Sequence, residues 1–214
     1  MRVGILGSGV VGQSLASGFA EHGHEVMIGT QTPGKPELAT WKASVRGTAS
    51  VGTFAQAAGH GELLVLSCKG SVTDEVIALA GAGAFDGKVV IDTTNPLDFS
   101  KGMPPGLFVG LEDSLGERIQ RALPKARVVK CFNIVPAPVM AHPSRLSPRP
   151  TMLIAGNDPV AKADVARVLQ DFGWEPPVDL GPIESARWLE ALVPLWVRVA
   201  ASIGNFNVAF RAVT

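Results

Sequence analysis

The chain has 214 residues, of which 46% are hydrophobic, and its 19 basic and 19 acidic side chains give a formal net charge of zero. This length is enough to bury the core of one domain. The balanced charge excludes a global field that would attract nucleic acid or an anionic membrane surface. No apolar stretch approaches the ~20 residues of a transmembrane helix. The chain contains no tyrosine, which excludes any mechanism that depends on a Tyr–Lys pair.

The chain begins directly with a strand-like stretch, MRVGILG, rather than with a signal peptide. Its two cysteines, Cys68 and Cys131, lie in apolar runs and lack the spacing of metal ligands. This pattern is typical of reduced core thiols. We therefore expect a cytoplasmic protein with no metal site.

Short apolar runs alternate with helical segments along most of the chain. The first run, Arg2–Leu6, is followed by Val11, Leu15 and Phe19, whose spacing predicts a helix with one buried face. Further strands are expected at Val26–Gly29, Val51–Thr53, Leu63–Ser67, Val89–Asp92, Val128–Phe132 and Met152–Ala155, and helices at Ala55–Ala58, Thr73–Ala80 and Ser114–Ala122. This alternation predicts an α/β fold with a doubly wound, mostly parallel sheet.

The end of the chain is expected to form one more helical segment. Asp158 suits a helix N-cap and Gly173 a helix exit, and a final helix is predicted from about Ile183. Its apolar residues recur every three or four positions: Trp188, Leu192, Trp196, Val199, Ile203, Phe206 and Phe210. Such a stripe covers the sheet, forms a dimer seam or closes a lid over a ligand. We expect a main domain at residues 1–180, a C-terminal helical extension at residues 181–214, and a homodimer.

The stretch from Gly7 to Gly12, GSGVVG, has the pattern G-x-G-x-x-G. It follows the first strand and opens the first helix, which is the context in which this pattern binds a dinucleotide. Gly7 permits a tight turn, Gly9 lets the backbone approach a pyrophosphate, and Gly12 lets the helix pack on the strand. The diphosphate is expected at the helix N-terminus.

The stretch GHEVMIGTQTPGK points to the form of that dinucleotide. An NAD site usually places an acidic residue near the end of the second strand, where it binds the ribose 2′-hydroxyl. Here no acidic residue follows the strand until Glu37, and Thr30, Gln31 and Lys35 stand there instead. These side chains can donate hydrogen bonds to a 2′-phosphate. The sequence therefore predicts NADP.

The loops after the later strands are SCKGSV, TTNPLD and NIVPAPVM, and a ligand is expected across them. Cys68 has no histidine near it in sequence, and Lys69 is typical of a solvated loop or a phosphate neighbour. Asn95 and Asn133 either cap strand ends or orient a carboxamide or ring carbonyl. No acid–base pair is expected. Direct hydride transfer between two cofactors needs proximity and orientation rather than a proton shuttle, so we predict no catalytic side chain.

Four stretches, MRVGILGSGVVGQSLASGFAEHGHEVMIGT, VVIDTTNPL, VVKCFNIV and PVDLGPIESARWLEALVPLW, resemble the family of F420-dependent NADP reductases. The same pattern is similar to the oxidoreductase domain of STEAP-type ferric reductases. The resemblance implies a Rossmann-type domain that binds NADP and passes hydride directly to or from a deazaflavin, coenzyme F420, or a flavin, FAD or FMN. The electron partner is then a small molecule.

The resemblance also implies roles for particular positions. It places the pyrophosphate at Gly7, Ser8, Gly9, Val10, Val11 and Gly12, and the 2′-phosphate at Thr30, Gln31 and Lys35. It places the nicotinamide beside Ser67, Cys68 and Lys69, and the second cofactor beside Asn95, Pro96, Leu97, Asn133, Ile134, Val135 and Pro136. The chain departs from the family pattern at Gln31, where an arginine is usual, and at SCKG, which replaces a more apolar loop.

Three alternatives stay open at this point. A flavin or ferric reductase that uses NADPH fits the same motifs. An imine reductase shares the glycine loop but carries a longer helical dimerisation domain. A non-catalytic NADP sensor would bind the dinucleotide and use its C-terminal stripe to recruit a partner. Turnover with different acceptors separates these readings.

Overall fold

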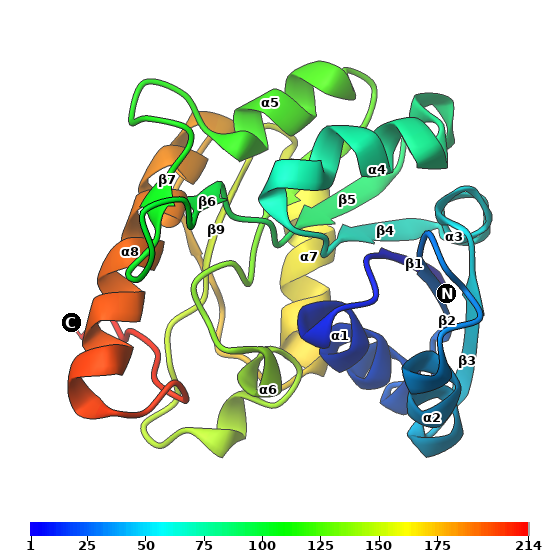
Figure 1. Cartoon of the computed structure of the whole chain (residues 1–214), viewed down its shortest axis with the longest axis horizontal. Coiled ribbons are helices and arrows are strands. Elements are labelled where there is room, and N and C mark those ends of the chain that lie inside the picture. The colour runs from blue at the N-terminus through cyan, green and yellow to red at the C-terminus, as the bar shows by residue number, and fades with distance from the viewer. Residues whose placement is uncertain (214) are drawn as a thin grey trace.

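The computed structural model describes residues 1–213, so Thr214, the last residue of the expected extension, lies outside it. An eight-stranded sheet runs through the molecule in the order β10-β9-β8-β5-β4-β1-β2-β3 (Figure 1). Its strands are β1 Arg2–Leu6, β2 Glu25–Gly29, β3 Thr48–Gly52, β4 Leu63–Leu66, β5 Val89–Asp92, β8 Arg127–Lys130, β9 Leu153–Gly156 and β10 Val178–Asp179. Only the β8–β9 pairing is antiparallel within this sheet. The expected doubly wound, mostly parallel α/β fold is confirmed.

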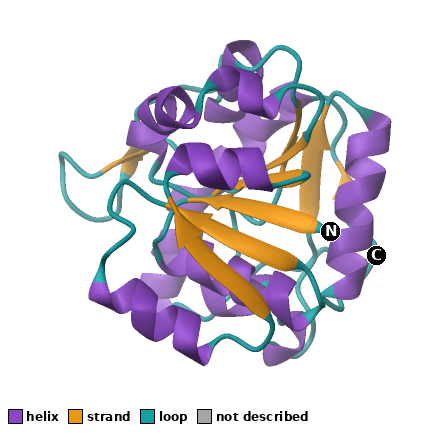
Figure 2. Ribbon diagram, turned by 90° about the vertical axis from the view of Figure 1, so that its right-hand side faces the viewer, coloured by secondary structure: helices purple, strands orange, loops and turns teal. Residues whose placement is uncertain are grey.

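Helices cover both faces of the sheet (Figure 2). They are α1 Val10–Glu21, α2 Pro36–Ser44, α3 Phe54–His60, α4 Thr73–Ala80, α5 Leu115–Ala122, α6 Ala137–Met140, α7 Pro159–Asp171 and α8 Ala186–Ile203. Short 3₁₀ turns are η1 Gly70–Val72, η2 Ala82–Phe85, η3 Pro143–Arg145 and η4 Ile183–Ser185. One core lies between the sheet and α1, α6 and α7, and the other between the sheet and α3, α4 and α5.

Helices α2 and α6, strand β10 and one small hairpin lie outside the sequence prediction. Helix α2 buries only Leu38 and Trp41, so its apolar periodicity is too weak to detect. The hairpin is antiparallel, consists of β6 Leu97–Asp98 and β7 Gly106–Leu107, and lies beside α8 (Figure 1). Its strands are two residues each, too short for a period-of-two pattern. None of the helices in residues 1–213 combines the length and hydropathy that a membrane crossing needs.

Helix α8 is apolar on two faces, and this corrects the predicted stripe. The buried face, which packs on a third core cluster with Ile134 and Ala155, consists of Leu189, Val193 and Val197. The predicted stripe is divided: Leu192 and Trp196 are partly buried and pack against the same cluster, whereas Trp188 is 59% and Ile203 60% exposed on the outer face. Gly204, with a φ of 65°, ends the helix, so Phe206 and Phe210 lie beyond it. Consecutive side chains on a helix point in directions about 100° apart around its axis. When a helix is apolar on more than one face, its sequence does not show which face is buried.

Candidate functional site

The glycine loop joins β1 to α1. Gly7 has a φ of 136° and its N–H donates to the Gly29 carbonyl (3.1 Å), which sets the loop against the end of β2. A Cβ at Gly12 would lie 2.1 Å from the Gly7 carbonyl oxygen, so that glycine is required by packing. At Gly9, in contrast, a Cβ would meet no protein atom within 4 Å. Packing does not require glycine at this position, whereas the close approach of a ligand would.

The loop offers backbone donors to an anion at that point. Gly9 is the N-cap of α1 and has extended dihedral angles, and no side chain caps the helix. Ser8 is half-buried, and Val10 is 72% exposed. The first N–H groups of α1 therefore face outward, with the positive end of the helix dipole behind them. This geometry fits the predicted pyrophosphate position.

Thr30 connects this loop to the rim beyond β2. Its side chain is 4% exposed, and its hydroxyl oxygen accepts from the Ser8 hydroxyl (3.1 Å) and from the Thr32 N–H (3.4 Å). Gln31 and Lys35 are exposed, and Lys35 is the N-cap of α2. Contact of these three residues with a 2′-phosphate stays a prediction. Of the three, Thr30 is in contact with the glycine loop, through the Ser8 hydroxyl.

A pocket of about 570 Å³ opens at the carboxyl ends of β4 and β5, beside Val11 of α1. Its lining is Val11, Ser67, Cys68, Lys69, Gly70, Ser71, Thr93, Thr94, Asn95, Leu97, Asp98 and Phe99. It brings together six residues of the predicted site: Val11, Ser67, Cys68, Lys69, Asn95 and Leu97. Gly70, Ser71, Thr93, Thr94 and Asp98 were not named as site residues but lie in the two loops across which a ligand was expected, and Phe99 follows the second of them.

Five of the residues predicted beside the second cofactor do not line the pocket: Asn133, whose contacts are described below, and four with buried side chains. The Ile134 and Val135 side chains are 3% and 6% exposed and belong to core clusters. Pro96 and Pro136 are also buried, and Pro136 precedes helix α6 as its N-cap. Because the side chains of these four residues are buried in the protein, a ligand could contact only their backbone atoms.

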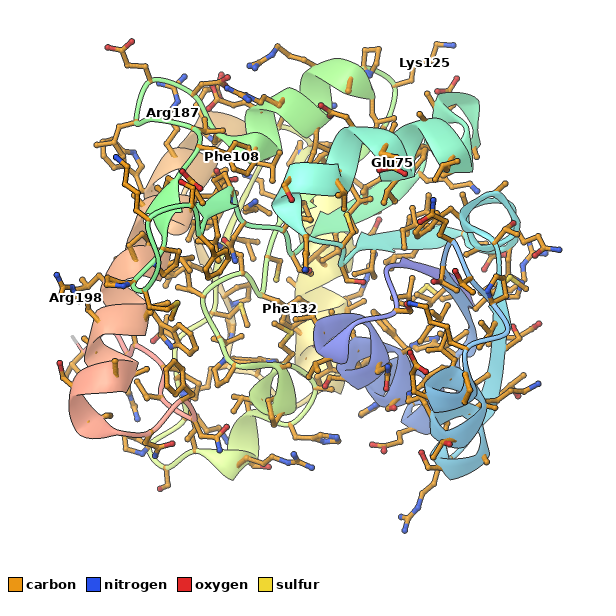
Figure 3. All side chains as sticks on the ribbon, viewed as in Figure 1. Glu75, Phe108, Lys125, Phe132, Arg187 and Arg198 are labelled. Atoms are coloured by element: carbon orange, nitrogen blue, oxygen red, sulfur yellow. The ribbon has the colours of Figure 1, made fainter. Side chains whose placement is uncertain are left out.

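Asn95 and Asn133 form a hydrogen-bonded pair across the ends of β5 and β8. Asn133 Nδ2 donates to Asn95 Oδ1 (2.9 Å) and to the Leu189 carbonyl in α8 (3.0 Å), and Asn95 Nδ2 donates to the Asn133 carbonyl (2.9 Å). The preceding residue, Phe132, is fully buried in the middle of the molecule (Figure 3) and has a φ of 65°. Such a backbone conformation costs about 1–3 kcal/mol for a bulky residue. It turns the chain out of β8 and brings Asn133 to Asn95.

A fully buried ionic cluster lies under the same loop. Lys130 Nζ lies 2.9 Å from Asp92 Oδ2 and 2.6 Å from Glu190 Oε1, and donates to the Thr94 carbonyl (2.7 Å). The Glu190 carboxylate also accepts the N–H groups of Leu115 and Gly116 at the start of α5. Burial alone would lower the pKa of Lys130, but the two carboxylates outweigh it and raise that pKa.

The sequence contained a signal for this cluster. Asp92 and Lys130 end two apolar runs, VVID and VVK, and the register pairs them directly. Opposite charges at the ends of two adjoining buried strands predict an ion pair, since a buried charge is rarely left unpaired. Glu190, in the apolar stretch WLEAL, was the third indication.

Three titratable side chains line the pocket: Cys68, Lys69 and Asp98. Burial, opposed in part by a hydrogen bond with Thr73, raises the pKa of the Cys68 thiol to about 11. A backbone hydrogen bond from Ser100 lowers the pKa of Asp98, which is therefore charged at neutral pH. Lys69 is exposed. The absence of a catalytic side chain stays a prediction.

Comparison with known proteins identifies the family. Residues 2–96 match the family described as NADP oxidoreductase, coenzyme F420-dependent. A crystal structure of a candidate F420-dependent NADP-reductase from Arthrobacter sp. FB24 is 38% identical with a TM-score of 0.96, and the match covers 100% of both chains. The F420-dependent NADP reductase of Methanocaldococcus jannaschii is 28% identical over 92% of this chain and 91% of its own length.

A second curated relative is much longer than this chain. Metalloreductase STEAP3 of Rattus norvegicus is 29% identical over 99% of this chain, which spans only 41% of that protein. The full-length match at 38% identity agrees with the family model and with the archaeal reductase. The chain belongs to the family of coenzyme F420-dependent NADP oxidoreductases.

Proposed function

We propose that the protein transfers hydride directly between NADP(H) and the deazaflavin coenzyme F420. The observation that carries this proposal is the pocket that opens beside the glycine loop at the carboxyl ends of β4 and β5, in a chain whose full-length relatives are F420-dependent NADP reductases by name. A reductase of alcohols or imines needs a group that donates a proton to the developing charge. Hydride exchange between two bound rings instead needs the rings to be held in contact. The names of the full-length relatives support F420 as the second ring.

The residues present fit NADP. The space in front of Gly9 and the outward N–H groups of α1 would hold the pyrophosphate, and Thr30, Gln31 and Lys35 would surround the 2′-phosphate. When bound, the cofactors supply the chemistry: reduced nicotinamide gives up a hydride, and oxidised deazaflavin takes up that hydride and one proton. The protein's part is to place the two rings at the carboxyl ends of β4 and β5 and to exclude water from them.

Flavin or ferric reduction is the second candidate, because STEAP3 is a metalloreductase and matches this chain almost from end to end. FAD or FMN would then replace F420 in the pocket. The relatives that resemble this chain over their own full length are named for F420, so we place F420 first.

Turnover of NADPH with oxidised F420, followed by the deazaflavin absorbance, tests the proposal against FAD and FMN under the same conditions. We expect F420 to be reduced much faster than either flavin. Turnover with a flavin alone would replace the proposal with the second candidate. Binding of NADPH without turnover of any acceptor would indicate the non-catalytic sensor.

A matched pair of glycine variants checks that this activity comes from the glycine loop. A valine in Gly9→Val has room in the protein and suits the extended backbone there, so the fold should be retained. NADPH affinity should fall about 10-fold or more, because the side chain takes the space of the ligand. The control Gly59→Ala adds a Cβ that also meets no protein atom within 4 Å, in α3, away from the pocket. Equal NADPH affinities for the two variants would contradict this placement.

We also propose that the protein is a homodimer that buries the outer face of α8. Large apolar side chains are about half exposed on α8, just after its end, and in or near the neighbouring hairpin: Trp188, Leu195, Ile203, Phe206, Phe99, Met103, Phe108 and Leu111. Taking about 150–250 Å² for a large side chain, they offer on the order of 700 Å². Each partner of a stable complex buries about 800 Å². Arg198 on α8 points away from the body of the molecule (Figure 3) and would lie at the edge of such an interface.

Light scattering tests the dimer. The variant Leu195→Glu should shift the protein toward monomer, whereas Leu79→Glu, at a 47% exposed position on α4, should not. A wild-type protein that is monomeric at tens of micromolar would contradict the proposal. The exposed face of α8 would then need another explanation.

A further inference from the structure

One wall of the pocket is bonded to the buried ionic cluster. This pocket wall consists of Thr93, Thr94 and Asn95, three consecutive residues of the lining. The N–H and the hydroxyl of Thr94 both donate to Asp92 Oδ1 (2.8 and 2.7 Å). Its carbonyl accepts from Lys130 Nζ (2.7 Å). The N–H, the hydroxyl and the carbonyl of Thr94 are therefore all held by the Asp92–Lys130 ion pair.

The rest of the pocket wall is fixed by the sheet and by the neighbouring loop. The N–H and the hydroxyl of Thr93 donate to the Leu66 carbonyl at the end of β4 (3.0 and 2.9 Å). The Asn95 carbonyl oxygen packs so closely against Gly70, another residue of the lining, that a Cβ there would lie 2.1 Å from it. A displacement of Thr94 would move Asn95 against Gly70 and change the shape of the pocket.

The stability of the fold does not by itself explain why charges stand at these two positions. Lys130 and Asp92 are both 0% exposed. Removing two charges from water costs about as much as their attraction returns, so replacement of a buried ion pair by neutral groups of similar volume is often neutral or stabilising. A neutral apolar side chain at position 130 would fill the same space but would offer no donor to the Thr94 carbonyl. The contact with the pocket wall is what the lysine adds.

We propose that Lys130 is a positioning residue of the pocket, which together with Asp92 fixes the Thr94 backbone and thereby the wall beside the bound ring. Lys130 itself does not touch the ligand. The inference rests on the proposed function for the identity of that ring. Ligand affinity then depends on the donor at position 130, whereas stability depends on the balance of charge in the cluster. Substitutions can separate these two effects.

Two variants make the separation. Lys130→Met removes the donor and leaves Asp92 without its counter-charge. Lys130→Met/Asp92→Asn also removes the donor, but asparagine is uncharged and keeps an Oδ1 for the N–H and the hydroxyl of Thr94. A neutral pair then replaces an ion pair with no net charge, so the cluster keeps the net charge that Glu190 gives it. The double variant should regain at least half of the melting temperature that Lys130→Met loses.

Calorimetry measures the dissociation constants of three ligands. NADP⁺ and 5-deazariboflavin carry the two rings proposed for the pocket, whereas adenosine 2′,5′-bisphosphate has the 2′-phosphate but no ring beyond the adenine. At least one of the first two should bind about 10-fold more weakly to both variants, because small displacements in a site weaken its contacts. The third should bind within about twofold of wild type, since the rim follows β2, three strands away from β5 in the sheet.

A matched control and a measurement without ligand complete the test. Lys125→Met/Asp86→Asn makes the same two substitutions in an exposed ion pair (3.0 Å) and should bind all three ligands as the wild type does. Hydrogen exchange followed by mass spectrometry reports on the pocket wall directly. The segment with Thr94 and Asn95 should exchange about 10-fold faster in Lys130→Met/Asp92→Asn than in the wild type.

Each outcome supports or overturns the positioning role. Wild-type affinity for both NADP⁺ and 5-deazariboflavin in the double variant, or unchanged exchange in the pocket wall, would show that the cluster is only structural. An equal loss of affinity for adenosine 2′,5′-bisphosphate would place the damage outside the pocket and overturn the proposal. A double variant no more stable than Lys130→Met would do the same. Absence of F420 turnover would count against the proposed function alone, because neither binding nor exchange depends on turnover.

Discussion

Replacing Lys130 with methionine should remove a large part of the stability of the protein. Methionine keeps most of the length of the side chain but removes the charge that lies 2.9 Å from Asp92 and 2.6 Å from Glu190. Lys130 and Asp92 are 0% exposed and Glu190 is 3% exposed. Removal of one partner from such a buried pair costs about 3–5 kcal/mol, because an uncompensated charge stays behind. Whole proteins are stable by only about 5–15 kcal/mol.

Urea unfolding followed by circular dichroism measures this loss, and a melting experiment should show a decrease of about 6–20 °C for a chain of this size. The control is Lys125→Met, whose ammonium lies 3.0 Å from Asp86 at the surface (Figure 3), with side chains 74% and 46% exposed. That exposed pair should contribute less than about 1 kcal/mol. Equal losses in the two variants would refute the reasoning that the burial of the cluster makes Lys130 critical.

Three further predictions concern the rim, the thiol and acid stability. Gln31→Arg should raise the preference for NADPH over NADH in kcat/KM about 10-fold through a bidentate phosphate contact. Thr30→Glu should reverse this preference. If both variants keep the wild-type ratio, the placement of the 2′-phosphate is wrong. With a pKa of about 11, only about one Cys68 thiol in a thousand is ionised at pH 8, so alkylation by iodoacetamide should be slow and Cys68→Ala active. Rapid alkylation would contradict the raised pKa. A hydrogen bond from Arg121 lowers the pKa of Asp113 from 3.8 to about 2, so this carboxylate stabilises the fold above about pH 4 and loses that effect as the pH falls to 2. Asp113→Asn should flatten this part of the stability–pH curve by no more than about 1 kcal/mol, since the pair is partly exposed, and an unchanged curve would exclude this contribution.

The fold could be predicted because its signals are local. The strands of the sheet are short apolar runs that end at glycine, serine or a charged residue, and helices alternate with them. The glycine loop was identified because it stands between the first strand and the first helix. Helix α2 escaped detection because it lies at the edge and buries only two residues. Its one clear sign was Pro36 at the first helical position.

The site was less accessible to sequence reasoning, because it depends on which residues of neighbouring loops face inward. Ile134 and Val135 follow a strand end as Asn133 does, yet their side chains turn into the core. Position after a strand predicts proximity to a ligand, but not the direction of a side chain. The left-handed turn at Phe132 decides that direction here, and no residue type at this position announces it, since glycine or asparagine would be usual.

Two adjacent residues of α8 connect its position to the pocket. The Leu189 carbonyl accepts from Asn133, and Glu190 binds Lys130, which in turn holds the Thr94 carbonyl at the pocket wall. Both contacts are made from the inner face of α8, while the outer face carries the exposed apolar side chains. A rotation of α8 by one position, about 100°, would break both contacts at once. The helix therefore has one register in which its outer face is free for a partner and the pocket is intact. Burial of that face in a dimer would stabilise this register and, with it, the arrangement of Asn95 and Asn133.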